Sequence, residues 1–424
     1  MQTGTDIVKI SRMERITANG VPKKIFSDRE IEYIASKSHR AQTAAGMYAA
    51  KEAYLKAVGK GIFSVPLSSI EVLHRDSGMP YISVSVNSDI SNMPSFADVS
   101  IAHDGEYAIA FVALSRDENH KRFIKAISVF DNCSDDVIAP TEVAALLPKR
   151  AADMHKGTCG RLFVAAGSRG LTGAAIMSCR SALRCGAGLV TLGCCGSLND
   201  IFENSLLEAM TLPLPDENGT FSTDAARIVA EKAAAADVCL AGPGIGRSSG
   251  AMQVTYSVTA ARGVRAVIDA DGLYALSQNK DILASHGAEL ILTPHIGEFS
   301  ALTGLDSEII LQNTKKLAAE FAQKYNVTLV LKSHRTVVAA PDGKCFENIL
   351  GNPGMATGGS GDVLAGAIAS FAAQGMSAAD AAKAGVFIHS LAADMVAADK
   401  GEYSLLPEDI IETLPYAIKY ISGR

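Results

Sequence analysis

The 424-residue chain contains no tryptophan, and aromatic residues make up only 6% of it. None of its eight cysteines forms a C-x-x-C pair, which argues against a cysteine-based metal site. We interpret them as reduced thiols of a cytosolic protein. No apolar run approaches the roughly 20 residues of a membrane span, and charge enters as early as Asp6. We therefore expect no secretory signal, no membrane partner and a cytoplasmic location.

What the chain does contain is typical of globular enzymes. Its length predicts two or three domains, and 48% hydrophobic with 20% charged residues allows sizeable cores. The net charge of −6 is uneven, because residues 1–60 carry +5 and the remainder −11. The basic part is either a solvated face or a surface for an acidic protein partner. Nucleic acid is not expected, since no basic run alternates with aromatics.

A change of texture predicts the domain organisation. The polar stretch 115–122 (SRDENHKR) separates two kinds of sequence, and we place the domains at 1–117 and 131–424 with a linker at 118–130. The second domain alternates strand-like runs with Ala-rich helical windows, which predicts an α/β fold with a mostly parallel sheet covered by helices. Its expected strands are 162–166, 189–192, 238–241, 266–268, 290–292 and 328–331.

The first domain is too short for such a sheet and predicts an α+β fold with an antiparallel sheet. We expect its strands at 6–10, 70–73, 81–86 and 107–114, and a long helix at 41–58. Another helix should begin after Ser27, which stands three residues before Glu30 in the order of a capping box.

Charged residues of the first domain suggest a metal and phosphate site. Asp6 opens a strand, Glu52 and Lys56 share one helix face, and His103 precedes the last strand. Glu52 and Lys56 could form an ordinary helical salt bridge. Two carboxylates and a lysine could equally hold Mg²⁺ against a diphosphate, because Mg²⁺ takes one or two carboxylates and fills its octahedron with phosphate oxygens and water.

Four ordered motifs of this domain resemble the holo-acyl-carrier-protein synthase family: residues 4–12 (GTDIVKISR), 49–57 (AAKEAYLKA), 76–81 (DSGMPY) and 99–104 (VSIAHD). The resemblance implies a phosphopantetheinyl-transferase fold. It also implies Mg²⁺-dependent transfer of 4′-phosphopantetheine from coenzyme A to a serine of an acyl carrier protein. Asp6 and Glu52 would bind Mg²⁺, Lys56 would neutralise the leaving 3′,5′-ADP, and His103 would lie near the nucleotide phosphates.

The same resemblance implies partners for this domain. Arg12 and Arg15, with nearby lysines, suit the acidic recognition helix of a carrier protein. Members of the family form trimers, so we expect a homo-oligomer through residues 1–117. Many relatives carry Arg where this chain has Met47, which could weaken the transferase. A non-catalytic assembly or docking module is the alternative.

The second domain has its strongest signal at residues 352–364 (NPGMATGGSGDVL), where a glycine run opens an Ala-rich helix. Free backbone N–H groups and the helix dipole at such a start form a cradle for a phosphoryl group. Asp362 would stand at its edge as a general base. A simple helix cap with tight glycines is the alternative.

Loops after the expected strands carry further polar or glycine-rich motifs at 167–174 (GSRGLTGA), 242–246 (GPGIG) and 293–298 (TPHIGE). The first lacks the G-K-[ST] ending of a P-loop, and the second is a weak match to a dinucleotide fingerprint. All three would lie at the carboxyl ends of parallel strands, where open α/β sheets bind ligands.

Together with the pieces 155–161, 186–190, 269–271 and 331–336, these motifs resemble the NAD(P)H-hydrate dehydratase family over about 137–418. The resemblance implies a ribokinase-like fold. It implies dehydration of (S)-NADHX and NADPHX to NADH and NADPH, with ADP, or ATP in some relatives, as phosphoryl donor. Asp362 would deprotonate the hydroxyl of the hydrated ring, and its oxygen would then attack the terminal phosphoryl group.

Site residues follow from that resemblance. The residues that would contact the hydrate are Ala174, Gly246, His295 and Asp362. The residues that would contact the adenine nucleotide are Lys332, Ser333, His334, Arg335, Thr336, Gly359, Ser360 and Gly361. Ser333 stands where glycine is common, which leaves the choice of nucleotide open. A ribokinase-like kinase for a small alcohol is the alternative, and the motifs around His295 and Lys332 argue against it.

Overall fold

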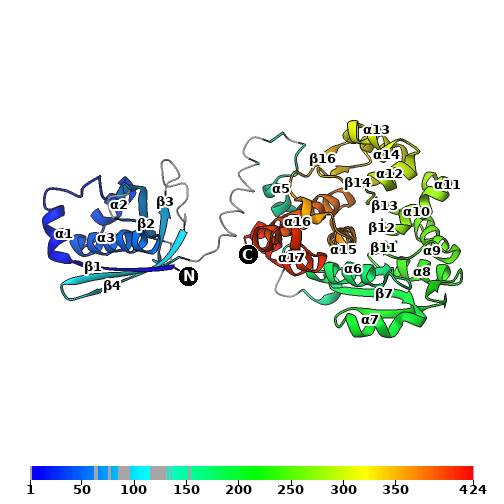
Figure 1. The fold of residues 1–424 in the computed structure, drawn as a ribbon, viewed down its shortest axis with the longest axis horizontal. Helices are drawn as coiled ribbons and strands as arrows, with labels where there is room; N and C mark the ends of the chain where they lie inside the picture. Colours follow the sequence, from blue (N-terminus) through cyan, green and yellow to red (C-terminus); the bar gives the residue numbers. More distant parts are fainter. Residues whose placement is uncertain are drawn as a thin grey trace. The chain divides into compact units, whose positions relative to one another are not determined.

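The computed structural model describes residues 2–61, 65–74, 78–84, 96–114, 130, 133–134, 136–150 and 154–423. The chain divides into two compact units, Met1–Lys125 and Ala126–Arg424 (Figure 1). Two domains were expected, and each has its expected fold class. The linker expected at 118–130 lies outside the described residues except for Phe130, so its boundaries stay a prediction.

The first unit is an antiparallel sheet covered by one long helix. Within its described residues five strands pair in the order β1-β5-β4-β3-β2. Their bounds are β1 Gln2–Lys9, β2 Ile70–His74, β3 Pro80–Val84, β4 Phe96–Asp104 and β5 Tyr107–Leu114; the helices are α1 Ile10–Thr17, α2 Asp28–Ala35, α3 Arg40–Ala57 and η1 Leu67–Ser69. The antiparallel sheet, the long helix and the Ser27–Glu30 capping box are confirmed. Sequence reasoning missed α1 and β4.

Helix α3 packs closely on the sheet because its facing residues are small. A Cβ at Gly4 of β1 would lie 2.0 Å from the carbonyl oxygen of Ala53, so only glycine fits there. Ala49, Ala50 and Ala53 are fully buried in this contact. The close approach brings Asp6, two residues after Gly4, beside the C-terminal half of α3.

A buried ion pair joins α2 and α3 to the sheet. Nζ of Lys51 donates hydrogen bonds to Glu30 (2.7 Å) and to the carbonyls of Ile25 (2.7 Å) and Leu67 (3.0 Å). The Glu30 carboxylate also accepts from the backbone nitrogens of Ser27 and Val72, at 2.8 Å each. Both side chains are fully buried, and because burial disfavours the charged amine it lowers the pKa of Lys51.

The second unit is built on a mostly parallel sheet. Among its described residues nine strands pair in the order β16-β15-β14-β13-β12-β11-β6-β7-β8, and only β15 runs antiparallel to its neighbours, β14 and β16. The strands are β6 Arg161–Ala165, β7 Leu189–Cys195, β8 Met210–Leu214, β11 Val238–Ala241, β12 Arg265–Ile268, β13 Glu289–Leu292, β14 Thr328–Leu331, β15 Val337–Ala339 and β16 Cys345–Glu347; β9 Asp216–Glu217 and β10 Thr220–Phe221 form a separate hairpin.

Helices cover both faces of this sheet (Figure 1). One layer holds α6 Thr172–Arg184, α15 Ser360–Ala373, α16 Ala378–Lys400 and α17 Pro407–Ser422, with α5 Pro140–Leu146 beside them. The opposite layer holds α8 Ala225–Ala235, α9 Ser249–Ala260, α10 Asp271–Gln278, α12 Ile296–Thr303 and α14 Thr314–Tyr325. The remaining helices are α7 Asn199–Ser205, α11 Lys280–Ala284 and α13 Ser307–Gln312, with the short turns η2 Lys156–Thr158, η3 Gly196–Leu198, η4 Pro353–Met355 and η5 Glu402–Ser404.

The six strands expected from the sequence are confirmed as β6, β7, β11, β12, β13 and β14. Their residues read as unbroken apolar runs because both sheet faces are covered. Helix α16 is apolar and long enough to cross a membrane by length and composition, but 83% of its most apolar window is buried inside the unit. It therefore serves as a core helix of this fold.

Two candidate active sites

The acidic cluster of the first unit forms where β1 meets α3. Nζ of Lys56 donates to Oδ1 of Asp6 (2.7 Å) and to the carbonyl of Thr5 (3.1 Å). Asp6 is only 8% exposed. Burial raises the pKa of Glu52, and the charge of Asp6 raises it further. The structure thus brings together Asp6, Glu52 and Lys56, which the sequence had placed 46 and 4 residues apart.

A divalent cation fits this cluster. The Oδ2 atom of Asp6 is buried and accepts no hydrogen bond from any residue that the structure describes. A buried acceptor without a partner is costly, and the neighbouring Glu52 carboxylate adds a second hard oxygen ligand. One or two carboxylates are what a protein offers to Mg²⁺ when the substrate brings phosphate oxygens.

The other predicted residues of this unit surround the cluster at different distances. A Cβ at Gly46 would lie 2.9 Å from Nε2 of His103, so this imidazole lies against α3 about 9 Å along the helix from Glu52. Arg12 and Arg15 are exposed on α1. The Arg12 guanidinium lies 5.7 Å from the ring centre of Tyr48, whereas Nε of Arg15 donates to the carbonyl of Ser11 (3.4 Å).

Tyr48 is a residue of this site that sequence reasoning did not single out. Its hydroxyl lies beside the Glu52 carboxylate, and burial together with this carboxylate raises the pKa of Tyr48 to about 12. The preceding Met47 is 1% exposed and lies in the hydrophobic core. A cation at position 47 would therefore have to be buried on this backbone, and the cation over the aromatic ring comes from Arg12 instead.

In the second unit, the polar residues gather at the carboxyl ends of the parallel strands. Oδ1 of Asp269, after β12, accepts hydrogen bonds from Oγ1 of Thr293 (2.7 Å) and from Nζ of Lys332 (2.9 Å). Asp269 is 1% exposed. Although burial lowers the pKa of Lys332, the charges of Asp269 and Glu298 outweigh this and leave it raised. Lys332 is thus held as a cation whose side chain is only 18% exposed.

The turn after Asp269 directs a second carboxylate to the neighbouring loop. Ala270 has φ 48° and ψ −120°, a conformation that strains any residue with a Cβ. Beyond it, Asp271 accepts hydrogen bonds from the backbone nitrogen of Gly246 (3.1 Å) and from Nε of Arg247 (2.9 Å). The strained turn therefore separates two carboxylates with different partners, Asp269 bound to Lys332 and Asp271 bound to the loop after β11.

Asp362 lies in the first turn of α15, at the glycine run. Gly359 precedes the helix with φ 103°, which favours glycine. A Cβ at Gly361 would lie 3.3 Å from Nζ of Lys332, so the helix start faces the buried cation. Burial raises the pKa of Asp362 to about 7; Asp269 raises it and Lys332 lowers it. A carboxylate with this pKa is suited to general base catalysis near neutral pH.

The remaining residues that the sequence predicted to contact the hydrate lie around the same edge. Ala174, at the start of α6, lies against the loop after β11. A Cβ placed on Gly244 of that loop would be 2.9 Å from the Cβ of Ala174. His295 caps α12: its backbone nitrogen donates to Glu298 (2.8 Å), and its Nδ1 accepts from the nitrogen of Glu298 (3.2 Å). Burial raises the pKa of Glu298 to about 7. Burial and Lys332 lower the pKa of His295.

Residues 333–336 form a compact turn after Lys332. The Ser333 hydroxyl donates to the carbonyl of Arg335 (2.7 Å) and accepts from its nitrogen (3.2 Å), and Thr336 donates to the Ser333 carbonyl. The serine side chain therefore satisfies its own turn. Arg335 also pairs with Glu347 on β16 (3.1 Å).

Three site residues had weak signals or none in the sequence. Asp269 and Glu298 stood inside recognised motifs, but their roles depend on strand order. His389 lies on α16, 3% exposed, with Nε2 3.4 Å from the hydroxyl of Ser360. Burial lowers its pKa to about 4, with Lys332 contributing. The neutral imidazole of His389 therefore packs against Ser360, the first residue of α15.

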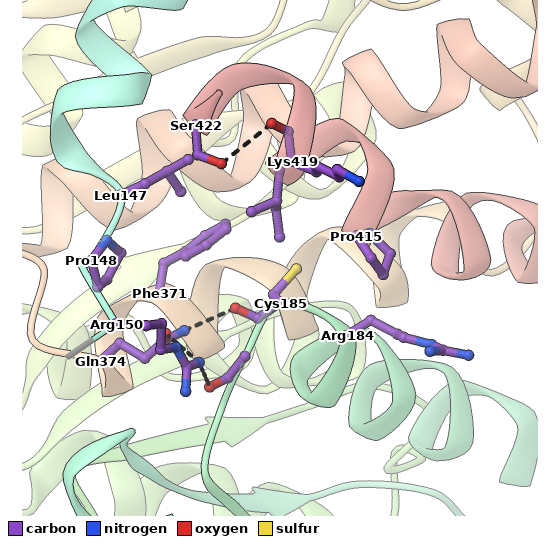
Figure 2. Close-up of a pocket in the computed structure, with 12 residues that line it drawn as sticks. Leu147, Pro148, Arg150, Arg184, Cys185, Phe371, Gln374, Pro415, Lys419 and Ser422 are labelled. Carbon is purple, nitrogen blue, oxygen red and sulfur yellow. Dashed lines mark hydrogen bonds between the residues drawn. The ribbon is translucent and has the colours of Figure 1, made fainter. Parts of the chain in front are cut away.

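A cavity of about 430 Å³ lies elsewhere in the unit, between α5, α6, α15 and α17 (Figure 2). Its lining includes apolar Leu147, Phe371 and Pro415, with Arg184 and Lys419 at one side. None of the predicted site residues lines it. The chemistry of this unit is therefore assigned to the carboxyl edge of the sheet and not to this cavity.

Comparison with known proteins supports both units. A family model described as NAD(P)H-hydrate dehydratase matches residues 162–416, and one described as 4′-phosphopantetheinyl transferase superfamily matches residues 2–112. The ADP-dependent (S)-NAD(P)H-hydrate dehydratase of Listeria monocytogenes is 33% identical over 289 residues, which are 67% of this chain and 97% of that relative.

Other relatives extend beyond the match. The bifunctional NAD(P)H-hydrate repair enzyme of Moorella thermoacetica is 39% identical over 274 residues, 64% of this chain and 52% of that enzyme, so the chain spans about half the length of such relatives. The ADP/ATP-dependent NAD(P)H-hydrate dehydratase of Bacillus subtilis, co-crystallized with ATP and Mg²⁺, has 28% identity and a TM-score of 0.58, covering 67% of this chain and 98% of that structure. The chain therefore belongs to the NAD(P)H-hydrate dehydratase family and carries an N-terminal unit of the 4′-phosphopantetheinyl transferase superfamily.

Proposed function

We propose that the second unit converts (S)-NADHX and NADPHX to NADH and NADPH with ADP, or ATP, as phosphoryl donor. The observation that carries this proposal is the position of Asp362, in the first turn of α15 facing Lys332. The names of the relatives from Listeria monocytogenes and Bacillus subtilis support the substrate and the donor.

In the proposed reaction, Asp362 takes the proton from the hydroxyl group of the hydrated nicotinamide ring. The resulting oxygen attacks the terminal phosphoryl group of ADP, and the bond to AMP breaks. The free N–H groups at the start of α15 and the Lys332 cation stabilise the charge on that phosphoryl group. The ring nitrogen then expels inorganic phosphate as the C–O bond breaks, and loss of a proton from the adjacent ring carbon forms the double bond that restores the reduced cofactor.

The hydrate and the nucleotide would occupy different sides of Asp362. We assign the hydrate to Ala174 at the start of α6, Gly246 in the loop after β11 and His295 at the N-cap of α12. We assign the nucleotide to residues 332–336 and 359–361. The test is incubation of the purified chain with NADHX and ADP or ATP. Recovered cofactor absorbance with free phosphate supports the dehydratase, whereas a phosphorylated organic product would identify a small-molecule kinase.

For the first unit we propose transfer of 4′-phosphopantetheine from coenzyme A to a carrier-protein serine. The buried, unpartnered Oδ2 of Asp6 beside Glu52 is the observation that carries it. These two carboxylates would hold Mg²⁺, which supplies charge neutralisation at the diphosphate. The serine oxygen attacks the phosphoryl group that bears the pantetheine arm, and 3′,5′-ADP leaves. Lys56 neutralises that leaving group.

We assign the binding of the carrier protein and of coenzyme A in this unit to charged and polar side chains. Arg12 and Arg15 would bind the acidic helix of an acyl carrier protein, and His103 would approach the phosphates of coenzyme A. A mass shift of the carrier protein in the presence of coenzyme A and Mg²⁺ tests the transferase. A chain that binds the carrier without modifying it would be a docking module.

A trimer through this unit is proposed from the outer face of its sheet. Ile7 of β1 and Ile109 and Phe111 of β5 are 58%, 39% and 46% exposed, on the face away from α3. Neighbouring apolar side chains of this kind mark interfaces more often than free surface. Light scattering on the full chain should give an oligomer, and Phe111→Glu should dissociate it. We place the protein in the cytoplasm, in keeping with its seven buried or half-buried free thiols.

A further inference from the structure

Tyr48 shares one face of α3 with Glu52, since the two residues stand four apart on the helix. Its ring is only 6% exposed, and its hydroxyl lies beside the Glu52 carboxylate, about one helical turn further along α3. A buried phenol has few alternative positions, so its hydroxyl fixes the direction in which one carboxylate oxygen points. The carboxylate keeps its remaining acceptor sites for a cation.

Arg12 holds the same ring from the other side of the site. Its guanidinium lies 5.7 Å from the ring centre, within the range of a cation–π contact. Arg12 follows Asp6 by six residues, and β1 passes directly into α1 between them. One short segment therefore supplies both the carboxylate that faces Glu52 and the cation that restrains Tyr48.

We propose that Tyr48 is a positioning residue that orients Glu52 toward a divalent cation, with Arg12 restraining the phenol. The proposal rests on the transferase function assigned to this unit. Groups that hydrogen-bond to metal ligands typically change metal affinity or activity by 10- to 100-fold when they are removed. If Tyr48 served only to fill the core, a phenylalanine at this position would bind the cation equally well.

The decisive variant is Tyr48→Phe in the full chain, which removes the hydroxyl and keeps the ring. Binding of Mn²⁺, in the presence of coenzyme A, is followed by electron paramagnetic resonance. Tyr48→Phe should weaken this binding about 10-fold and raise the Mg²⁺ concentration for half-maximal transfer, while kcat at saturating Mg²⁺ stays near the wild-type value. The control is Tyr33→Phe on α2, whose ring also lies beside a cation, Lys37 at 4.4 Å; it should leave Mn²⁺ binding unchanged.

A second pair of variants tests the restraint from α1. Arg12→Gln and Arg15→Gln remove the same charge from the same exposed helix. Loss of a positive charge near the site would by itself strengthen cation binding. The proposal requires the opposite for Arg12→Gln, weaker Mn²⁺ binding, and no weakening for Arg15→Gln.

These measurements separate the inference from the function on which it rests. Mn²⁺ binding is measured without turnover, so it decides the role of Tyr48 even if no carrier protein is modified. Unchanged Mn²⁺ affinity in a folded Tyr48→Phe protein would overturn the inference. Absence of carrier modification by the wild-type chain would overturn the proposed transferase.

Discussion

Nζ of Lys332 lies 2.9 Å from Oδ1 of Asp269. Asp269 follows the carboxyl end of β12 and Lys332 that of β14, 63 residues later in the sequence. The pair is buried beside the first turn of α15, where Asp362 lies. Asp269 raises the pKa of Asp362 and Lys332 lowers it, and burial carries it to about 7. Burial thus brings the pKa of the proposed general base near neutral pH, and the two charges of the ion pair act on it in opposite directions.

Asp362→Asn should abolish most hydrate repair and spare nucleotide binding. The amide is nearly isosteric, so the start of α15 keeps its geometry, but the proton acceptor is lost. Removal of a general base costs roughly 10²–10⁴ in rate, or about 3–5 kcal/mol of transition-state stabilisation. Calorimetry should show ADP affinity equal to or slightly above the wild-type value. The control is Asp281→Asn, an exposed aspartate of α11; near-normal turnover of Asp362→Asn would make His295 the next candidate.

The pH profile of repair should report Asp362. Asp362 must be ionised to act as the base, so kcat/KM should rise as pH increases through about 7. Asp269→Asn removes the neighbouring negative charge and frees Lys332 from its ion pair, so that the lysine acts more strongly on Asp362. Both effects lower the pKa of Asp362, and the rising limb should therefore move to lower pH. A limb that stays in place or moves upward would show that another group titrates.

The same carboxylate should make stability depend on pH. Because its folded-state pKa is raised above 3.8, the folded protein holds the proton more tightly than the unfolded chain does, and stability falls as pH rises toward 7. Asparagine does not titrate. The gain in Tm of Asp362→Asn over the wild type, measured without ligands, should be larger at pH 8 than at pH 5; equal gains would contradict the buried charge.

Breaking the Lys51–Glu30 pair should destabilise the first unit. Lys51→Met leaves Glu30 as a buried charge without its cation, which typically costs about 3–5 kcal/mol. The added change Glu30→Gln should recover part of the loss. Lys23→Met is the matched control, because Lys23 and its partner Asp28 are largely exposed, and solvent screens such surface pairs so that their loss changes stability little. Calorimetric melting of the full chain compares them; equal effects of Lys51→Met and Lys23→Met would contradict this assignment.

Local patterns allowed much of the fold to be predicted. The Ser27–Glu30 capping box and the apolar runs of β11 to β14 depend on residues close in sequence. Three strands at or next to the sheet edges were missed because they lack a long apolar run. β8 has only one buried residue, Leu214, and carries a proline, while β15 and β16 have three residues each. Short or half-exposed strands are specified by pairing with neighbours rather than by their own residues.

The sites were predictable only as motifs. Asp6, Glu52, Asp362 and Lys332 stood in recognisable patterns, but the contact of Lys332 with Asp269 depends on the strand order. In the sequence His389 is an ordinary polar residue of an apolar helix, and its contact with Ser360 depends on how α16 packs against α15. The hydroxyl of Tyr48 gains meaning only from the placement of Arg12 and Glu52 around it.

The most direct test of the central claim, two separate active sites in one chain, is a pair of variants assayed for both reactions on the same preparations. Asp6→Asn removes a proposed metal ligand, and Asp362→Asn removes the proposed base. The account predicts that Asp6→Asn loses the carrier-protein mass shift and keeps cofactor repair, while Asp362→Asn does the reverse. Loss of both activities in either folded variant, or loss of neither, would contradict it.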